Sequence, residues 1–143
     1  MLIRTPHNAI TRRIIGAAIE VHSALGPGLL ESAYVECLQH EMTLRKLRFV
    51  RELQIPLTYK AITLEMYYRV DLIVEDVVVV EVKSVASVLP VHEAQILTYL
   101  RLTACPLGLL INFNEARLVD GITRVVNPRI EAHGETVSHG APE

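Results

Sequence analysis

Hydrophobic residues recur every three or four positions in two stretches near the start of the chain. The turn "GPG" at residues 26–28 separates these stretches, so the pattern predicts two consecutive helices. The same spacing predicts a third helix over residues 91–102, ended by Pro106. The first two apolar stripes consist of Ile10, Ile14, Ala17, Ala18, Val21 and Leu25, and of Leu30, Ala33, Tyr34, Cys37, Leu38 and Met42.

From residue 49 the hydrophobic period changes to two, which is typical of strands. We predict strands over residues 49–59, 62–74 and 77–83, with a hairpin turn at Lys60-Ala61. Pro56 lacks a backbone N–H and therefore suggests an edge position or a bulge. Residues 107–113 form another fully apolar strand, and residues 116–126 a last strand or hairpin.

The resulting order, α-α-β-β-β-α-β-β, predicts an α/β fold with a mixed central sheet and helices on both faces. A strand–helix–strand passage is a right-handed crossover between parallel strands, so residues 77–83 and 107–113 should be central neighbours. Burial on both faces would explain four consecutive valines in "VVVVEVKS". We expect one domain over residues 1–126 and a flexible tail over residues 127–143, which offers little to bury.

Composition excludes several classes of protein. Half of the 143 residues are apolar and only 5% aromatic, so the core is aliphatic. No apolar run is long enough to span a membrane, and Cys37 and Cys105 match no metal or redox spacing. The chain start "MLIRTPHNAI" lacks a secretory apolar stretch. We therefore expect a soluble, cytoplasmic protein with no membrane partner.

The net charge of −2 argues against a generally basic coat for nucleic acid. Any polyanion would have to be held locally. Arg12 and Arg13 are adjacent, and a second basic group lies in "LRKLRFVR" at residues 44–51. This second group is equally consistent with favourable cations at the C-terminal end of a helix.

Asp71, Glu81 and Lys83 interrupt otherwise apolar strands. Side chains alternate along a strand, so Glu81 and Lys83 share a face. A two-residue turn would pair Asp71 with Val80, whereas a three-residue connection or a bulge pairs it with Glu81. Adjacent buried carboxylates repel one another, and a hard divalent cation with oxygen ligands is the obvious remedy. A Glu-x-Lys triplet alone is usually a structural pair, but the upstream aspartate favours a site.

Four further side chains could converge on this site or serve the fold. Glu31 is on the apolar stripe of its helix, yet it also occupies the first turn, where the helix dipole favours a carboxylate. His22 lies on an apolar face, where a histidine is more often a satisfied core residue. Gln95 and Tyr99 share a face of the third predicted helix, a weak signal because such a tyrosine is usually core.

Asp71, the triplet Glu81-Val82-Lys83 and the order of elements resemble the core of the PD-(D/E)XK nuclease superfamily, which has a restriction-endonuclease-like fold. Valine rather than proline precedes the aspartate here. The stretch "GLLESAY" (residues 28–34) is similar to the naming motif of the GxxExxY family, a prokaryotic branch of that superfamily. The stretch "QILTY" is similar to the Gln-x-x-x-Tyr element of RecB-like nucleases. The resemblance extends from about residue 10 to residue 126.

The resemblance implies a Mg²⁺- or Mn²⁺-dependent nuclease that hydrolyses phosphodiester bonds of nucleic acid, DNA above all. Asp71, Glu81 and the Val82 carbonyl would hold the metal, and by resemblance Glu31 completes the set. Lys83 would orient or deprotonate the attacking water. The substrate would contact Gln95, Tyr99, Arg12 and Arg13. Two alternatives remain open, namely a binding or regulatory module without turnover and a structural, homo-oligomerising interaction domain.

Overall fold

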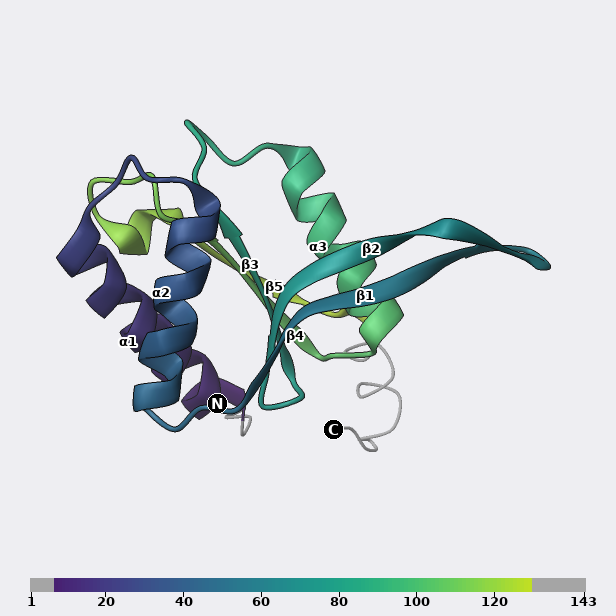
Figure 1. Ribbon diagram of the computed structural model, residues 1–143, viewed down its shortest axis with the longest axis horizontal. Coiled ribbons are helices and arrows are strands. Elements are labelled where there is room, and N and C mark those ends of the chain that lie inside the picture. The colour runs from purple at the N-terminus through teal and green to yellow at the C-terminus, as the bar shows by residue number, and fades with distance from the viewer. Residues whose placement is uncertain (1–6, 130–143) are drawn as a thin grey trace.

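Three layers make up the fold, with a five-stranded sheet between α1 and α2 on one side and α3 on the other (Figure 1). The computed structural model describes residues 7–129. The elements confirm the predicted order: α1 (His7–Leu25), α2 (Glu31–Leu44), β1 (Phe49–Tyr59), β2 (Ile62–Val74), β3 (Val78–Lys83), α3 (Pro90–Thr103), β4 (Leu107–Asn112), η1 (Leu118–Gly121) and β5 (Ile122–Val126).

The strands follow one another in the sheet as β1-β2-β3-β4-β5. β3 and β4 are parallel, and the other neighbours are antiparallel. The prediction that β3 is central and that β4 lies beside it in parallel is therefore confirmed. Because helices cover both faces of β3, neither face of this strand can tolerate solvent-seeking side chains along most of its length.

Alternate valines of β3 belong to two separate cores. Val78 and Val80 pack in the cluster built with α1 and α2, whereas Val79 packs in the cluster built with α3. α3 approaches β4 so closely that a Cβ atom at Gly108 would lie 2.8 Å from the Cδ1 atom of Ile96. A side chain at position 108 would therefore force the Ile96 side chain to move.

The β1–β2 hairpin turns at Lys60-Ala61 as predicted, with Tyr59 paired to Ile62. β1 is an edge strand, and the pairing register shifts between Pro56 and Thr58. Both interpretations of Pro56, an edge position and a bulge, thus apply. The hairpin extends well beyond the layered body (Figure 1).

The last predicted strand is too long. Only Ile122–Val126 is a strand, while Leu118–Gly121 forms a 3-10 turn in which the Asp120 N–H donates to the Arg117 carbonyl at 3.1 Å. The apolar signal at Leu118 reflects burial of this turn against the α1 side of the sheet.

Both ends of the chain extend beyond the described residues. Asn127 is buried, and its side-chain amide donates to the carbonyls of Leu100 and Cys105. The remainder of the predicted tail, residues 130–143, lies outside the described part of the chain. Within residues 7–129, no helix combines the length and apolarity needed to cross a bilayer.

Candidate active site

The connection between β2 and β3 sets which residues face each other across these strands. Residues 75–77 link the strands, with Glu75 and Asp76 in left-handed backbone conformations. The pairs are Val74 with Val78, Ile73 with Val79, and Leu72 with Val80, so the next positions to face each other are 71 and 81. The predicted three-residue connection is confirmed.

Beyond the third pair, side chains replace the backbone ladder between β2 and β3. The Asp71 N–H donates to the Glu81 Oε2 atom at 2.9 Å, and the Val82 N–H donates to the Asp71 Oδ2 atom at 2.9 Å. Each carboxylate is therefore fastened to the backbone of the opposite strand. The second oxygen of each group accepts no hydrogen bond from the described residues.

Burial opposes ionisation of both carboxyl groups. Glu81 is only 4% exposed, and desolvation followed by the charge of Asp71 raises the pKa of Glu81 to about 8. Desolvation also raises the pKa of Asp71, against the opposing effect of the Val82 N–H. Among the described residues neither carboxylate forms an ion pair. Near neutral pH this pair therefore retains a proton that two ordinary carboxyl groups would have lost.

Lys83 and Glu31 add opposite charges to the same place. The ammonium group of half-buried Lys83 lowers the pKa of both Asp71 and Glu81, whereas the carboxylate of Glu31 raises both. Glu31 is the first residue of α2, and its Oε2 atom accepts from the Ser84 N–H at 3.3 Å. Four predicted residues from three elements thus gather at the C-terminal end of β3.

The loop before α2 is clamped by Tyr34. Its hydroxyl group donates to the Gly26 carbonyl and accepts from the Leu29 N–H at 3.1 Å. Its ring stacks on Phe113 with centroids 4.5 Å apart. Gly28 lies between these contacts at a φ of +99°, a conformation that side chains rarely adopt. In "GLLESAY", therefore, the glycine makes the turn and the tyrosine holds the loop that leads to Glu31.

Ser84 and Asn112 hold the end of β3, and the sequence analysis missed both. The Ser84 Oγ atom donates to the Leu29 carbonyl at 2.6 Å, tying β3 to the loop before Glu31. The fully buried Asn112 side chain accepts from the Val85 N–H at 3.1 Å and donates to the Val85 carbonyl at 3.0 Å. A polar residue closing the apolar run "LGLLI" was the available signal for Asn112.

α3 places Tyr99 beside the carboxylates. The residue is 3% exposed and lies edge-on to Tyr68, with ring centroids 6.1 Å apart. Desolvation first, then the charges of Glu81 and Asp71, raise the pKa of Tyr99 to about 12, so the phenol remains neutral. Gln95 lies one turn earlier on α3 and is exposed.

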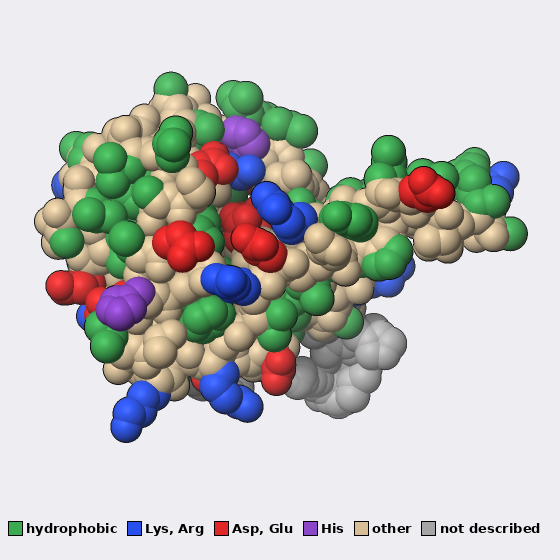
Figure 2. Space-filling view, in the orientation of Figure 1, with side chains coloured by type: hydrophobic (Ala, Val, Ile, Leu, Met, Phe, Trp, Pro, Cys, Tyr) green, Lys and Arg blue, Asp and Glu red, His purple; other side chains and the backbone are tan. Residues whose placement is uncertain are grey.

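The donor chemistry suits a hard divalent cation. Half-buried Asp71 and buried Glu81 each keep one carboxylate oxygen free of hydrogen bonds from the described residues, and such oxygens are the ligands that Mg²⁺ and Mn²⁺ prefer. Within residues 7–129, no three His, Cys, Asp or Glu side chains lie close enough together to hold a metal ion without rearrangement. Figure 2 shows acidic side chains flanked by basic ones at the centre of the visible face.

A family model of the PD-(D/E)XK nuclease superfamily matches residues 8–125. The chain belongs to this superfamily. Searches of curated proteins and of solved structures each found no match. Of the helices and strands, the match leaves out only the first residue of α1 and the last residue of β5. The whole described fold of this PD-(D/E)XK protein therefore corresponds to the superfamily domain.

The structure directs Arg13 away from the carboxylates of the PD-(D/E)XK site. The Arg13 guanidinium donates to the Arg45 carbonyl at 2.8 Å, just after the C-terminal end of α2. Glu31 begins the same 14-residue helix, so the two ends are about 20 Å apart. The expectation that Arg13 lies beside the site was therefore wrong, whereas a substrate contact of Arg12 stays a prediction.

Arg69 is the cation that the sequence analysis overlooked. It lies two residues before Asp71 on β2, and its charge lowers the pKa of that carboxyl group. The signal was present in "YYRVDLIV", where arginine and aspartate are two positions apart on one predicted strand. Its guanidinium is exposed, and the described residues form no ion pair with it.

The second basic group mostly has structural partners. Arg45 pairs with Glu41 at 2.8 Å, and the Arg51 Nη1 atom donates to the Gln39 Oε1 atom at 3.0 Å. These contacts agree with the interpretation of cations near a helix end. His22 is also a core residue, because it is buried and its Nε2 atom lies 2.7 Å from the Glu115 carbonyl.

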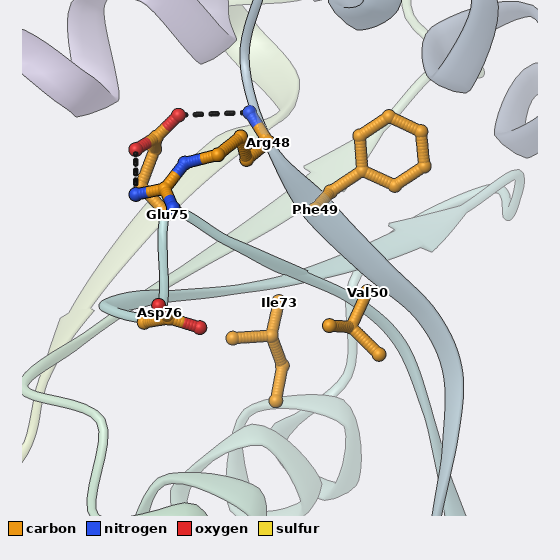
Figure 3. A pocket seen from close by; sticks show the side chains of 6 residues that line it. All are labelled: Arg48, Phe49, Val50, Ile73, Glu75 and Asp76. Atoms are coloured by element: carbon orange, nitrogen blue, oxygen red, sulfur yellow. Dashed lines mark hydrogen bonds and ion pairs between the residues drawn. The ribbon is translucent and has the colours of Figure 1, made fainter.

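A shallow pocket lies at the other end of β2 and β3, away from the carboxylate pair (Figure 3). Figure 3 shows Arg48 holding the Glu75 carboxylate at its rim, with N–H···O distances of 2.8 and 3.0 Å. This pocket contains no nucleophile, and its principal charges neutralise each other. Its lining residues are Arg48, Phe49, Val50, Ile73, Glu75 and Asp76.

Proposed function

We propose that the protein is a divalent-metal-dependent nuclease that hydrolyses phosphodiester bonds, with DNA as its substrate. The observation that carries this proposal is the pair of half-buried Asp71 and buried Glu81, which has raised pKa values and no ion-pair partner among the described residues. Such a pair costs stability, and perturbed carboxylates of this kind are typical of functional sites. Membership of a nuclease superfamily supports the same chemistry.

Asp71 and Glu81 would hold Mg²⁺ or Mn²⁺ through their unbonded oxygens, with Glu31 and the Val82 carbonyl as further oxygen donors. When bound, the metal stabilises negative charge on a phosphate group and lowers the pKa of a coordinated water. Glu31 can approach because its helix begins at the end of β3 and Ser84 fixes the loop that precedes it. Tyr34 would act as a positioning residue, since it clamps that loop.

Lys83 would orient the attacking water, assist its deprotonation, or stabilise the negative charge that develops on the phosphate. The lysine is half-buried and close enough to influence both carboxyl groups. Tyr99 and Gln95 would position the substrate, because they lie on one face of α3 and the tyrosine adjoins the carboxylates. Arg69 joins this set as the exposed cation nearest to Asp71 along β2.

Within the superfamily we propose membership of the GxxExxY branch. The support is the arrangement of the three motif residues. Gly28 makes the turn before α2, Tyr34 holds that loop through the Gly26 carbonyl, and Glu31 follows the loop and bonds Ser84. Gln95 and Tyr99 support a relation to RecB-like nucleases, because they share a helical face beside the metal-binding carboxylates.

The alternative is a nucleic-acid-binding or regulatory module without turnover. The net charge of −2 and the distance of Arg13 from the carboxylates favour it, since a nuclease must hold a polyanion at its site. The two functions differ in whether a phosphodiester bond breaks.

The deciding experiment incubates the full-length protein with linear, circular and single-stranded DNA and with RNA, in Mn²⁺, Mg²⁺ or EDTA. We expect cleavage of DNA in Mn²⁺ or Mg²⁺, none in EDTA, and none by Asp71→Asn in any buffer. Binding in Ca²⁺ without cleavage in Mn²⁺ would support the module without turnover. Cleavage by Asp71→Asn equal to wild type would identify a contaminating nuclease and overturn the assignment.

A further inference from the structure

The outer part of the β1–β2 hairpin, residues 56–67, forms an arm that projects from the layered body (Figure 1). Along the arm β1 and β2 pair only with each other, since the pairing of β2 with β3 is confined to residues 72–74 of β2. The arm is therefore a two-stranded ribbon with both edges open. Ribbons of this kind are marginally stable in water unless another surface covers them.

One face of the arm is apolar throughout. The pairs Ile55 with Tyr68 and Tyr59 with Ile62 each place both partners on one side of the ribbon. At the base of the hairpin, Ile55 and Tyr68 pack against the α3 core. Alternation continues this face outward, beyond the reach of that core, through Leu57, Tyr59, Ile62, Leu64 and Met66.

The apolar face of the arm is open to solvent. Tyr59, Ile62 and Met66 are 62%, 55% and 59% exposed, and Leu64 is 37% exposed. With about 200 Å² for each fully exposed side chain, these four present about 400 Å². Figure 2 shows hydrophobic side chains along the projecting arm. A contiguous patch of this size is comparable with the largest apolar patch of a typical monomer, roughly 300–600 Å², which is often functional.

We propose that this face is a homodimer interface, on which the arm of a second copy of the chain packs face to face. The strand residues of this face carry no charge, and the Lys60 ammonium at the tip of the arm lies 5.3 Å from the Tyr59 ring centroid, so the face offers few contacts to nucleic-acid phosphates. A bilayer is disfavoured because the open edges of the ribbon would carry unsatisfied backbone groups into lipid. An apolar strip whose strand residues carry no charge is complementary to itself, as a two-fold interface requires.

The areas agree with this occupant. Two arms would bury about 800 Å² of apolar side-chain surface between them, and the flanking backbone and rim side chains would add to it, toward the roughly 1,200–2,000 Å² of a specific interface. The opposite face carries Glu65, Tyr67 and Arg69 and would remain in water. The net charge of −2 per chain gives only weak repulsion between copies.

Sedimentation velocity of the full-length protein over a wide concentration range tests the proposal. We expect a monomer–dimer equilibrium in the wild type. The double variant Ile62→Ser/Met66→Ser should weaken dimerisation on the order of 100-fold or more, because four apolar side chains leave each interface. The matched control Tyr67→Ser changes an exposed aromatic residue of the same arm on its other face and should dimerise like wild type.

A crosslinking experiment locates the contact. In a Cys37→Ser background, which removes the exposed cysteine, Met66→Cys should yield a covalent dimer with a short bis-maleimide, whereas Tyr67→Cys should not. Circular dichroism must show that every variant is folded. A wild type that stays monomeric at high concentration, equal crosslinking at both positions, or association with phosphatidylcholine vesicles in place of self-association would each overturn the proposal. The outcome does not depend on nuclease activity.

Discussion

β2 and β3 carry carboxylates at both ends of their short paired stretch, and the two ends treat charge in opposite ways. At the connecting turn, Glu75 accepts hydrogen bonds from the Arg48 N–H and guanidinium, and these bonds lower its pKa. Three pairs away, burial raises the pKa of Asp71 and Glu81, and among the described residues neither has an ion-pair partner. One end of the paired stretch therefore has a carboxylate with an ion-pair partner, and the other end has two carboxylates without one among the described residues.

The difference separates a structural carboxylate from a candidate functional one. Glu75 stabilises the folded state when it is charged, because Arg48 already compensates that charge, so it needs no bound cation. Asp71 and Glu81 are destabilising when both are charged, and a cation would reverse that. A carboxylate that the fold leaves without compensation is a better guide to a site than the number of acidic residues or the depth of a pocket.

Removing single carboxylates at the two ends should give the largest contrast. We expect Asp71→Asn and Glu81→Gln each to lower Mn²⁺-dependent DNA cleavage by at least about 100-fold, because each removes charge from the metal site. Both amides can still accept the backbone hydrogen bonds, so the fold should survive. Glu75→Gln is the matched control and should cleave at nearly the wild-type rate. Equal losses at both ends would contradict the division between them.

Substitution of Lys83 tests whether its ammonium group takes part in catalysis or only offsets the negative charge of Asp71 and Glu81. We expect Lys83→Ala to reduce cleavage by about 100-fold, as loss of a group that stabilises developing charge does. Metal binding, measured by calorimetry, should be retained or become tighter because a nearby positive charge is gone. Arg48→Ala is the control at the other end and should leave both quantities unchanged. Full turnover in Lys83→Ala would reduce the lysine to a structural partner.

Stability in EDTA should fall as pH rises toward 8. The folded-state pKa of Glu81 is raised to about 8, so the stability from its bound proton is present below about pH 4.5 and lost as pH rises through 8. Glu81→Gln should flatten this dependence and melt about 5 °C or more above wild type at pH 9. Mn²⁺ should stabilise wild type more at pH 8 than at pH 5, because the metal binds deprotonated carboxylates. Calorimetric melting curves measure both effects.

Much of this arrangement could be predicted because the hydrophobic pattern of each strand indicates which of its faces are buried. The unbroken valines of β3 required helices on both faces, and Asp71 could join Glu81 only through a three-residue connection or a bulge, of which the structure has the first. Alternation also located β1, β2 and their turn to the residue. These features depend on local periodicity, which a sequence displays directly.

Other features depend on where separate elements meet, which periodicity does not encode. Nothing in the sequence shows that the ladder gives way to carboxylate–backbone bonds at Asp71 and Glu81. The direction of Arg13 toward the distant end of α2 follows from how two helices pack. The turn at residues 118–121 has strand-like composition, and only its burial beneath α1 distinguishes it.

The smallest expected effect lies at the turn and has the opposite sign of pH dependence. The pKa of Glu75 is lowered, so the stability it contributes is present above about pH 4.5 and lost as pH falls through its folded-state value. Glu75→Gln should therefore flatten the acid limb of the melting curve below about pH 4.5 while leaving the alkaline limb intact. The melting temperature of Glu75→Gln should differ from that of wild type by about 3 °C or less at pH 7, since the Arg48 side chain is 78% exposed and solvent screens the pair.

In 0.5 M salt this difference in melting temperature at pH 7 should shrink further. The effect of Glu81→Gln at pH 9 should persist, because buried charges are screened less than exposed ones. Equal salt sensitivity at the two positions would show that both carboxylates are surface charges and that the contrast between the two ends does not exist.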